Sequence, residues 1–280
     1  MTQILHVPDF PLSCYVDWLW YTDAPALYSR EKILPAPNVD LMINFGDPFQ
    51  VYAADDKQPP VTCSESWWVG LQSRYTVVEF PPNTNVLSMS FKPGGAYPFL
   101  HLPLSELQDQ VIPLAALWGS FAAEVRDRLY DVPAATERIA LLERLLLARL
   151  CEVPSGWGAM QFAVGRIARR HGVISIRALS GEMNMSHKHL IAQFKRMIGI
   201  SPKLLARIYR FQHLLDSINP TKSVDWAELA HQLSYHDQSH FSKDLKAFTG
   251  LSPGNYLRQR QKVLEVAPQY AHNLHHLAIG

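Results

Sequence analysis

The sequence predicts an α+β protein of two domains, with a β-rich N-terminal domain and an all-α C-terminal domain. Three observations support this prediction: the spacing of apolar residues changes along the chain, charge is divided unequally, and one basic segment is repeated. The chain has 280 residues, enough for two domains of about 100–200 residues each. Hydrophobic residues make up 48% and charged residues 18% of the chain, a composition typical of a globular protein.

The first 100 residues contain short apolar runs separated by turn signals. Runs at residues 41–45, 75–80 and 86–91 end at Gly-Asp-Pro, Pro-Pro-Asn and Lys-Pro-Gly-Gly, respectively. Short strands bounded by Pro and Gly are typical of a β-sandwich or β-barrel. A β-rich domain is therefore expected at the N-terminus.

From Pro113 onward the apolar residues recur at helical spacing. They predict a helical pair at about residues 113–151, and the segment 152–156 is the predicted domain boundary. We therefore expect a sensor or dimerisation domain at 1–155, a helical domain at 156–263 and a tail at 264–280. The leucine-rich face of the helix at 134–151 either forms a dimer contact or packs on its own domain.

Charge differs between the two halves of the chain. Residues 1–155 contain 10 Lys and Arg against 18 Asp and Glu, whereas residues 156–280 contain 16 against 7. A basic half joined to an acidic half suggests that the basic one binds a polyanion such as nucleic acid. The alternative interpretation is that the charged residues are merely solvated and that the charge difference has no role in binding.

Cysteine usage and hydropathy restrict the location of the protein. Cys14, Cys63 and Cys151 are widely spaced and form no Cys-x-x-Cys pair, which argues against a disulfide framework and a structural zinc site. No run approaches the ~18 apolar residues of a membrane span, and the start lacks the pattern of a signal peptide. We expect a cytoplasmic protein with no membrane partner.

The basic half contains an internal repeat. Residues 194–202 match residues 245–253 at an offset of 51, with identical Lys, Gly, Ser and Pro. Ser186 and Asp237 are candidate N-caps, and Gly199 and Gly250 stand where a left-handed C-terminal residue is favoured. A short helix precedes each cap, at residues 176–183 and 224–233. This pattern predicts two helix-turn-helix units, joined by a linker helix at 202–218 that spans about 25 Å.

These residues resemble the DNA-binding domain of the AraC/XylS family of bacterial transcription regulators. The resemblance covers residues 156–262, and its most specific parts are Ser186-x3-Leu190-x3-Phe194-Lys, the Gly-x-Ser-Pro that follows each second helix, and the segment 230–242. Asn184 and Ser234 replace the usual turn glycines, and Ser180 replaces the usual alanine. Segments 33–35, 40–46 and 91–100 resemble a cupin-like sensor domain of one subgroup. The family implies a sequence-specific regulator controlled by a ligand or by dimerisation.

The exposed N-terminal part of each second helix is expected to face base edges in the major groove. The predicted base-reading residues are His187, Lys188, Ile191, Ala192, Gln238, Ser239, Ser242 and Lys243. The predicted phosphate-binding residues, which supply affinity without sequence information, are Ser186, Lys195, Arg196 and Lys246. Since Ile191 and Ala192 are apolar, the second unit is expected to carry more of the hydrogen-bonded specificity. A solvated face is the alternative for any single Lys or Arg.

Aromatic residues enrich the N-terminal half. They are expected either to line an apolar ligand pocket or to form plain core: Trp18, Trp20, Trp67, Trp68, Tyr75 and Tyr97. The partners implied by this interpretation are duplex DNA, a small-molecule effector, a second copy of the chain and, for an activator, RNA polymerase.

Two alternatives to a DNA-binding regulator were weighed. One is a helical protein-interaction module beside an inert barrel, and the other is a metal-dependent cupin enzyme with a DNA-binding tail. The acidic half has only His6 and His101 and no His-x-His pair, so no metal, no other cofactor and no enzymatic activity are expected. His272, His275 and His276 have metal-like spacing if helical, although a surface or packed tail is the simpler interpretation.

Overall fold

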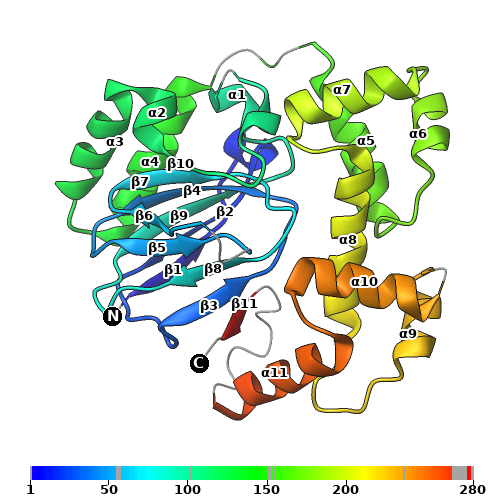
Figure 1. Ribbon diagram of the computed structural model, residues 1–280. Helices are drawn as coiled ribbons and strands as arrows, with labels where there is room; N and C mark the ends of the chain where they lie inside the picture. Colours follow the sequence, from blue (N-terminus) through cyan, green and yellow to red (C-terminus); the bar gives the residue numbers. More distant parts are fainter. Residues whose placement is uncertain are drawn as a thin grey trace.

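The computed structural model describes residues 2–54, 58–100, 102–150, 153, 155–235, 237–266 and 276–278. It confirms a β-rich N-terminal domain followed by an all-α C-terminal domain, which lie side by side (Figure 1). Residues 152 and 154 of the predicted boundary at 152–156 lie outside the described ranges.

The N-terminal domain is built from two antiparallel sheets that face each other. The first sheet has the order β1 (Gln3–His6), β2 (Val16–Thr22), β9 (Val86–Phe91), β4 (Val39–Asn44), β7 (Ser66–Val69) and β10 (Val111–Pro113). The second has the order β11 (His276–Ala278), β3 (Arg30–Ile33), β8 (Thr76–Glu79), β5 (Phe49–Tyr52) and β6 (Val61–Cys63). The three runs expected as strands are β4, β8 and β9.

Short helices pack on the outer face of the first sheet and at the end of the sheets nearest the helical domain (Figure 1). They are η1 (Leu12–Cys14), α1 (Tyr97–Leu100), η2 (Leu104–Glu106), α2 (Leu114–Trp118), α3 (Ser120–Tyr130) and α4 (Ala135–Arg149). The expected helical pair is thus three helices, because Gly119, with φ +57°, separates α2 from α3. Trp68 of β7 is fully buried in this layer and makes an edge contact with Trp118 of α2 at 5.7 Å.

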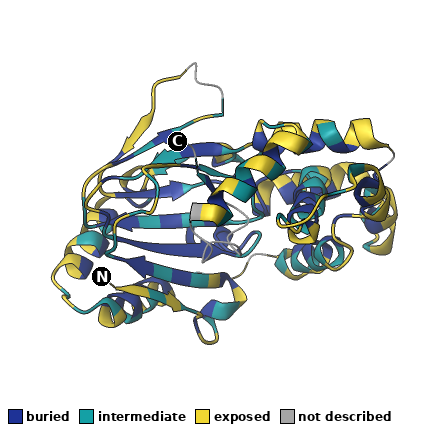
Figure 2. Ribbon diagram, turned by 90° about the horizontal axis from the view of Figure 1, so that it is seen from below, coloured by how far each residue is buried: buried dark blue, intermediate teal, exposed yellow. Residues whose placement is uncertain are grey.

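The leucine-rich face of α4 packs on its own domain. Ile139, Leu142 and Leu146 are almost completely buried, and α4 contacts β1 and β2. Figure 2 shows that the central strands of the domain are mostly buried, whereas each helix has a buried side and an exposed side. Of the two interpretations of this face, packing within the domain is the one observed in the monomer.

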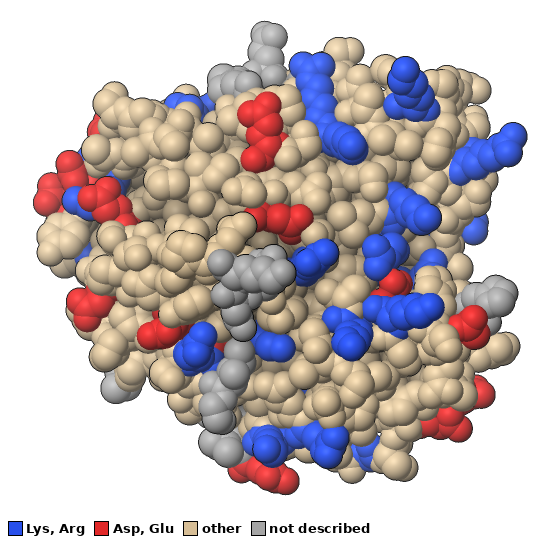
Figure 3. Space-filling model, in the orientation of Figure 1, with Lys and Arg blue, Asp and Glu red and all other residues tan. Residues whose placement is uncertain are grey.

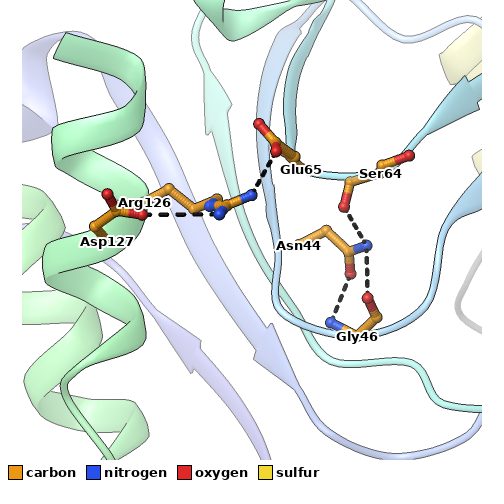
Figure 4. Close-up of polar contacts among 6 residues, drawn as sticks. All are labelled: Asn44, Gly46, Ser64, Glu65, Arg126 and Asp127. Atoms are coloured by element: carbon orange, nitrogen blue, oxygen red, sulfur yellow. Dashed lines mark hydrogen bonds and ion pairs between the residues drawn. The ribbon is translucent and has the colours of Figure 1, made fainter. Parts of the chain in front are cut away.

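One end of the two sheets is closed by a polar network (Figure 4). The side-chain amide of Asn44, at the end of β4, donates to the carbonyls of Asp47 at 2.9 Å and Ser64 at 3.1 Å. Beside it, Arg126 of α3 pairs with Glu65 at 2.7 Å and ties the helical layer to the β6–β7 turn. The two hydrogen bonds of Asn44 satisfy backbone carbonyls of the turns, which lie outside the strand pairings of the sheets.

The C-terminal domain contains seven helices among its described residues. They are α5 (Trp157–Arg169), α6 (Ile176–Glu182), α7 (His187–Met197), α8 (Pro202–Ser217), α9 (Trp226–Gln232), α10 (Gln238–Thr249) and α11 (Pro253–Val266). The long helix α8 connects the two smaller groups, and its side chains Leu205, Ile208 and Phe211 are fully buried. It corresponds to the expected linker helix.

The chain returns to the N-terminal domain at its C-terminal end. Residues 276–278 form β11, which pairs antiparallel with β3 through His276↔Ile33 and Ala278↔Glu31. No sequence pattern predicted this strand in the tail. The second sheet is therefore completed by a segment that follows the helical domain.

Candidate nucleic-acid interface

The first helix-turn-helix unit consists of α6, a tight turn and α7. Ser175 caps α6, and its Oγ accepts from the amide of Ala178 at 3.2 Å. Asn184 in the turn has φ +51°, and Ser186 caps α7 through a bond from the amide of His189 at 3.2 Å. Leu190, Phe194 and Met197 form the buried face of α7. The predicted N-cap and buried face are therefore present.

The second unit, α9 and α10, has the same design with a longer turn. Asp225 caps α9, and Asp237 caps α10 by accepting from the amide of His240 at 2.7 Å. The left-handed turn residue is Ser234, with φ +56°. Asn184 and Ser234 are 50 residues apart, whereas the caps Ser186 and Asp237 are 51 apart. The second turn therefore contains one additional residue before its cap.

Most predicted base-reading side chains are exposed. Ile191 and Ser242 are half-buried, and the exposed ones are His187, Lys188, Ala192, Gln238, Ser239 and Lys243. They lie in the N-terminal part of α7 or α10, which is the part of a recognition helix that faces base edges. This placement fits the predicted role without testing it.

The predicted phosphate-binding residues differ in their availability. Lys195 and Lys246 are exposed. Ser186 already accepts a capping bond. Arg196 donates from Nε to the hydroxyl of Tyr97 at 2.8 Å, and so it also contacts the N-terminal domain. Lys195 and Lys246 are the members of the set that the structure leaves directed to solvent.

An ion pair fixes α10 to the linker helix. Arg207 of α8 donates from Nη2 to Oδ1 of Asp244 on α10 at 2.7 Å, and Asp244 is only 5% exposed. The Arg207 guanidinium also lies 5.2 Å from the ring centre of Phe248. No local pattern in the sequence indicates this pair, because its partners are 37 residues apart and belong to different helices.

The charge asymmetry of the sequence is visible on the surface. In Figure 3 most blue Lys and Arg atoms lie over the helical side of the molecule, and red atoms are more frequent over the sheets. A basic face with few opposing carboxylates attracts a polyanion and releases its counterions on binding.

Both recognition helices end against the N-terminal domain. A Cβ added at Gly199, after α7, would lie 3.1 Å from the carbonyl oxygen of Leu104. One added at Gly250, after α10, would lie 2.7 Å from a ring carbon of Tyr75. Lys32 of β3 donates to the carbonyl of Thr249, the last residue of α10, at 3.1 Å. The N-terminal domain thus contacts the C-terminal ends of both helices and leaves their N-terminal ends open.

The six aromatic residues proposed for a ligand pocket do not converge on one cavity. Trp18 and Trp20 line a cavity of about 440 Å³ between the sheets. Trp67 lines a second cavity and Tyr75 a third. Trp68 belongs to the core, and Tyr97 is 8% exposed at the domain interface.

Histidines and acidic residues suggest no metal centre in the described parts of the chain. Within these ranges, no three His, Cys, Asp or Glu side chains are grouped so as to hold a metal ion. His6 pairs with Glu143 at 3.0 Å. His276 lies in strand β11, so the spacing considered for a helical tail does not apply to it, and His101, His272 and His275 lie outside the described residues. In the same ranges no helix combines the length and apolarity of a membrane span.

Comparison with known proteins identifies the class of the helical domain. Residues 179–259 match the model of a helix-turn-helix domain family, and residues 5–113 match a family described as a domain of unknown function, DUF6597. With two capped units joined by a linker helix, the C-terminal domain is a helix-turn-helix domain. It belongs to the AraC/XylS type of helix-turn-helix domains.

A curated relative is a regulatory protein. The chain is 30% identical over 127 residues to the Msm operon regulatory protein of Streptococcus mutans serotype c. The match covers 44% of this chain and 44% of that protein, so the chain aligns with less than half of its relative's length.

Solved structures that align with this chain include ToxT from Vibrio cholerae and the AraC-like transcriptional activator CuxR. ToxT is 10% identical, with a TM-score of 0.44 over 86% of this chain and 95% of that one. CuxR is 13% identical, with a TM-score of 0.26 over 76% of this chain and 86% of that one. The class assigned above rests on the family match and on the described elements.

Proposed function

We propose that this chain is a bacterial transcription regulator that binds duplex DNA through α7 and α10 in two adjacent major grooves. The observation that carries the proposal is the duplicated, capped recognition helix with an exposed N-terminal end. The linker helix α8 has 16 residues and spans about 24 Å at 1.5 Å per residue. It can hold two recognition helices on one face of DNA, where successive major grooves are about 34 Å apart.

The residues proposed to contact base edges are those predicted from the sequence. Lys188 and Lys243 suit guanine, and Gln238 suits adenine. Lys195 and Lys246 suit phosphates, to which they add affinity and register. The half-buried Ile191 offers an apolar surface for a thymine methyl group.

The N-terminal domain is proposed to control the relative position of the two recognition helices. It contacts α7 through Tyr97 and α10 through Lys32 and Tyr75. A ligand or a second copy of the chain that binds one arrangement better than another would shift the population of DNA-competent molecules. An activator would, in addition, contact RNA polymerase.

The cavity between the two sheets is the proposed effector site. Its wall includes His276 of β11, a strand that follows α11 of the helical domain. Arg260 of α11 donates to the backbone carbonyl of His276 at 3.3 Å. A ligand in the cavity would therefore contact a strand that is hydrogen-bonded to α11, and a shift of that strand would move α11.

The test is binding to random-sequence duplex DNA by fluorescence anisotropy at 50 and 200 mM salt. The variant carries Lys188→Ala, Lys195→Ala, Lys243→Ala and Lys246→Ala. We expect wild type to weaken steeply with salt, because each phosphate contact contributes about 0.9 to the slope of log K against log salt. The variant should lose most of the binding and much of that slope.

A control variant removes the same charge elsewhere. Arg30, Arg74, Arg128 and Arg144 are exposed residues of the N-terminal domain, and their replacement by Ala should leave DNA binding nearly intact. Equal losses in the two variants would reduce the effect to net charge. Failure of wild type to bind at 50 mM salt would contradict the proposal and favour a helical protein-interaction module.

Specificity is tested separately once an operator is selected. Gln238→Ala should cost about 1–3 kcal/mol on the operator and little on random DNA, whereas Lys246→Ala should weaken both alike. An equal effect of Gln238→Ala on both DNAs would remove Gln238 from the base-reading set.

A further inference from the structure

The cavity between the sheets has an unusual lining for a β-domain core. On the first sheet the register places Trp18 of β2 opposite Ser90 of β9, and Ser90 opposite Asp40 of β4. All three side chains line the cavity of about 440 Å³, with Trp20 in the next row. Two indoles on β2 and one carboxylate on β4 thus line the cavity on either side of the central strand β9.

The indoles are available to a ligand. Trp18 and Trp20 remain half-buried, whereas Trp68, on the opposite face of the same sheet, is fully buried. Indole rings with free surface inside a cavity offer the negative face of their π-system to a cation. The arrangement is therefore chemically selective as well as apolar.

Hydrogen bonds and the imidazole of His276 stabilise the charge of the Asp40 carboxylate only in part. Its Oδ1 accepts from Nδ2 of Asn38 at 2.7 Å, and Ser90 also hydrogen bonds to it. Among the described residues, no Lys or Arg forms an ion pair with Asp40. Burial raises the pKa of Asp40 to about 6, as expected for a carboxylate with too little solvation for its charge.

The other titratable residue of the cavity lining is His276. His276, the nearest source of positive charge, bonds through Nδ1 to Oε2 of Glu31 at 2.7 Å. Glu31 itself is 8% exposed. Glu31 is not part of the lining, so Asp40 is the carboxylate that the cavity presents, and the imidazole beside it is already paired.

We propose that this cavity binds a small organic cation, an ammonium group seated over Trp18 or Trp20 with Asp40 as its counter-ion. The proposal rests on the proposed function, since it names the chemical class of the effector. An ammonium ligand adds positive charge beside Asp40 and N–H groups whose hydrogen bonds its carboxylate accepts. An anionic ligand would meet the Asp40 carboxylate, and a neutral one would add no positive charge to balance it.

The test is calorimetric titration of the full-length chain with three matched probes. They are 2-phenylethylammonium, its neutral analogue 2-phenylethanol and the anion 3-phenylpropionate; tetramethylammonium and butylammonium extend the cationic set. We expect saturable binding of the cationic probes, at least tenfold tighter than that of the other two. Asp40→Asn should weaken cation binding at least tenfold, and Trp18→Leu should weaken it measurably.

Two controls distinguish loss of the site from a general effect of charge and from loss of the folded structure. Asp131→Asn removes an exposed carboxylate outside the cavity and should leave cation binding unchanged. Thermal unfolding of each variant shows whether it is folded. No saturable binding of any cationic probe, or equal binding of the neutral and anionic analogues, overturns the proposal.

Anisotropy with duplex DNA, measured on the same preparations without any probe, distinguishes the two proposals. DNA binding without cation binding would overturn the ligand class alone. Cation binding without DNA binding would overturn the proposed function and leave this site standing.

Discussion

The guanidinium of Arg196 donates a hydrogen bond to the hydroxyl of Tyr97 across the boundary between the two domains, with Nε 2.8 Å from the oxygen. Arg196 belongs to the first recognition helix, α7, and Tyr97 to the short helix α1 that follows strand β9. This contact connects the body that would bind DNA with the body that would sense a signal. It also occupies a side chain that the sequence assigned to phosphate binding.

Tyr97→Phe removes the acceptor and leaves the ring in place. We expect a loss of about 1 kcal/mol in the free energy of unfolding, the typical net value of one hydrogen bond, and faster amide exchange in α7. Urea unfolding and hydrogen exchange measure the two effects. Tyr130→Phe, at a residue that is 64% exposed, is the control. If exchange in α7 is the same in both variants, the contact does not restrain the helix.

Asp244→Ala removes the buried partner of Arg207. We expect a loss of about 2 kcal/mol, less than the 3–5 kcal/mol of a fully buried pair, because the Arg207 side chain is 37% exposed. Urea unfolding of the two single variants and the double variant with Arg207→Ala measures the coupling. Glu182→Ala, which breaks the solvent-screened pair with Arg166, should cost less than Asp244→Ala. Equal costs at the two sites would remove the special role of the buried pair.

Ser234→Gly relieves the backbone of the second turn. Ser234 has φ +56°, a left-handed conformation that costs an L-residue about 1–2 kcal/mol. Glycine regains part of this strain but loses more chain entropy on folding, so we expect a net gain of about 0.5–1 kcal/mol by urea unfolding. Asn184→Gly should gain less, since Asn tolerates this region better. A destabilised Ser234→Gly protein would contradict this account of the turn.

The pH dependence of stability should carry a contribution from Asp40. Its pKa is raised by burial from 3.8 to about 6, so between these values the unfolded chain is ionised while the folded one keeps its proton. The free energy of unfolding should therefore fall as the pH rises from about 4 to about 6. Unfolding of wild type and Asp40→Asn across this range isolates Asp40 from His276, which lines the same cavity, and from Glu31, which pairs with His276. Parallel pH profiles would contradict the raised pKa.

The sequence by itself determined the elements whose signals lie within a few residues. Ser186 and Asp237 cap the recognition helices because a side-chain oxygen satisfies an amide only three residues away. Gly199 and Gly250 stand at the helix ends with positive φ, and the apolar period gives α7, α8 and α10 their buried faces. Each of these features depends on local backbone geometry, which the order of residues encodes directly.

Only the tertiary structure decided which distant segments meet. The pairing of His276 with Ile33, the ion pair of Arg207 with Asp244 and the division of the six aromatic residues among cavities and core depend on register and packing. A one-residue change of register turns every side chain of a strand to the other face, so composition alone could not place Trp18 in a cavity and Trp68 in the core. Contacts between domains have no local signature, because their free energy comes from surfaces that exist only after both domains have folded.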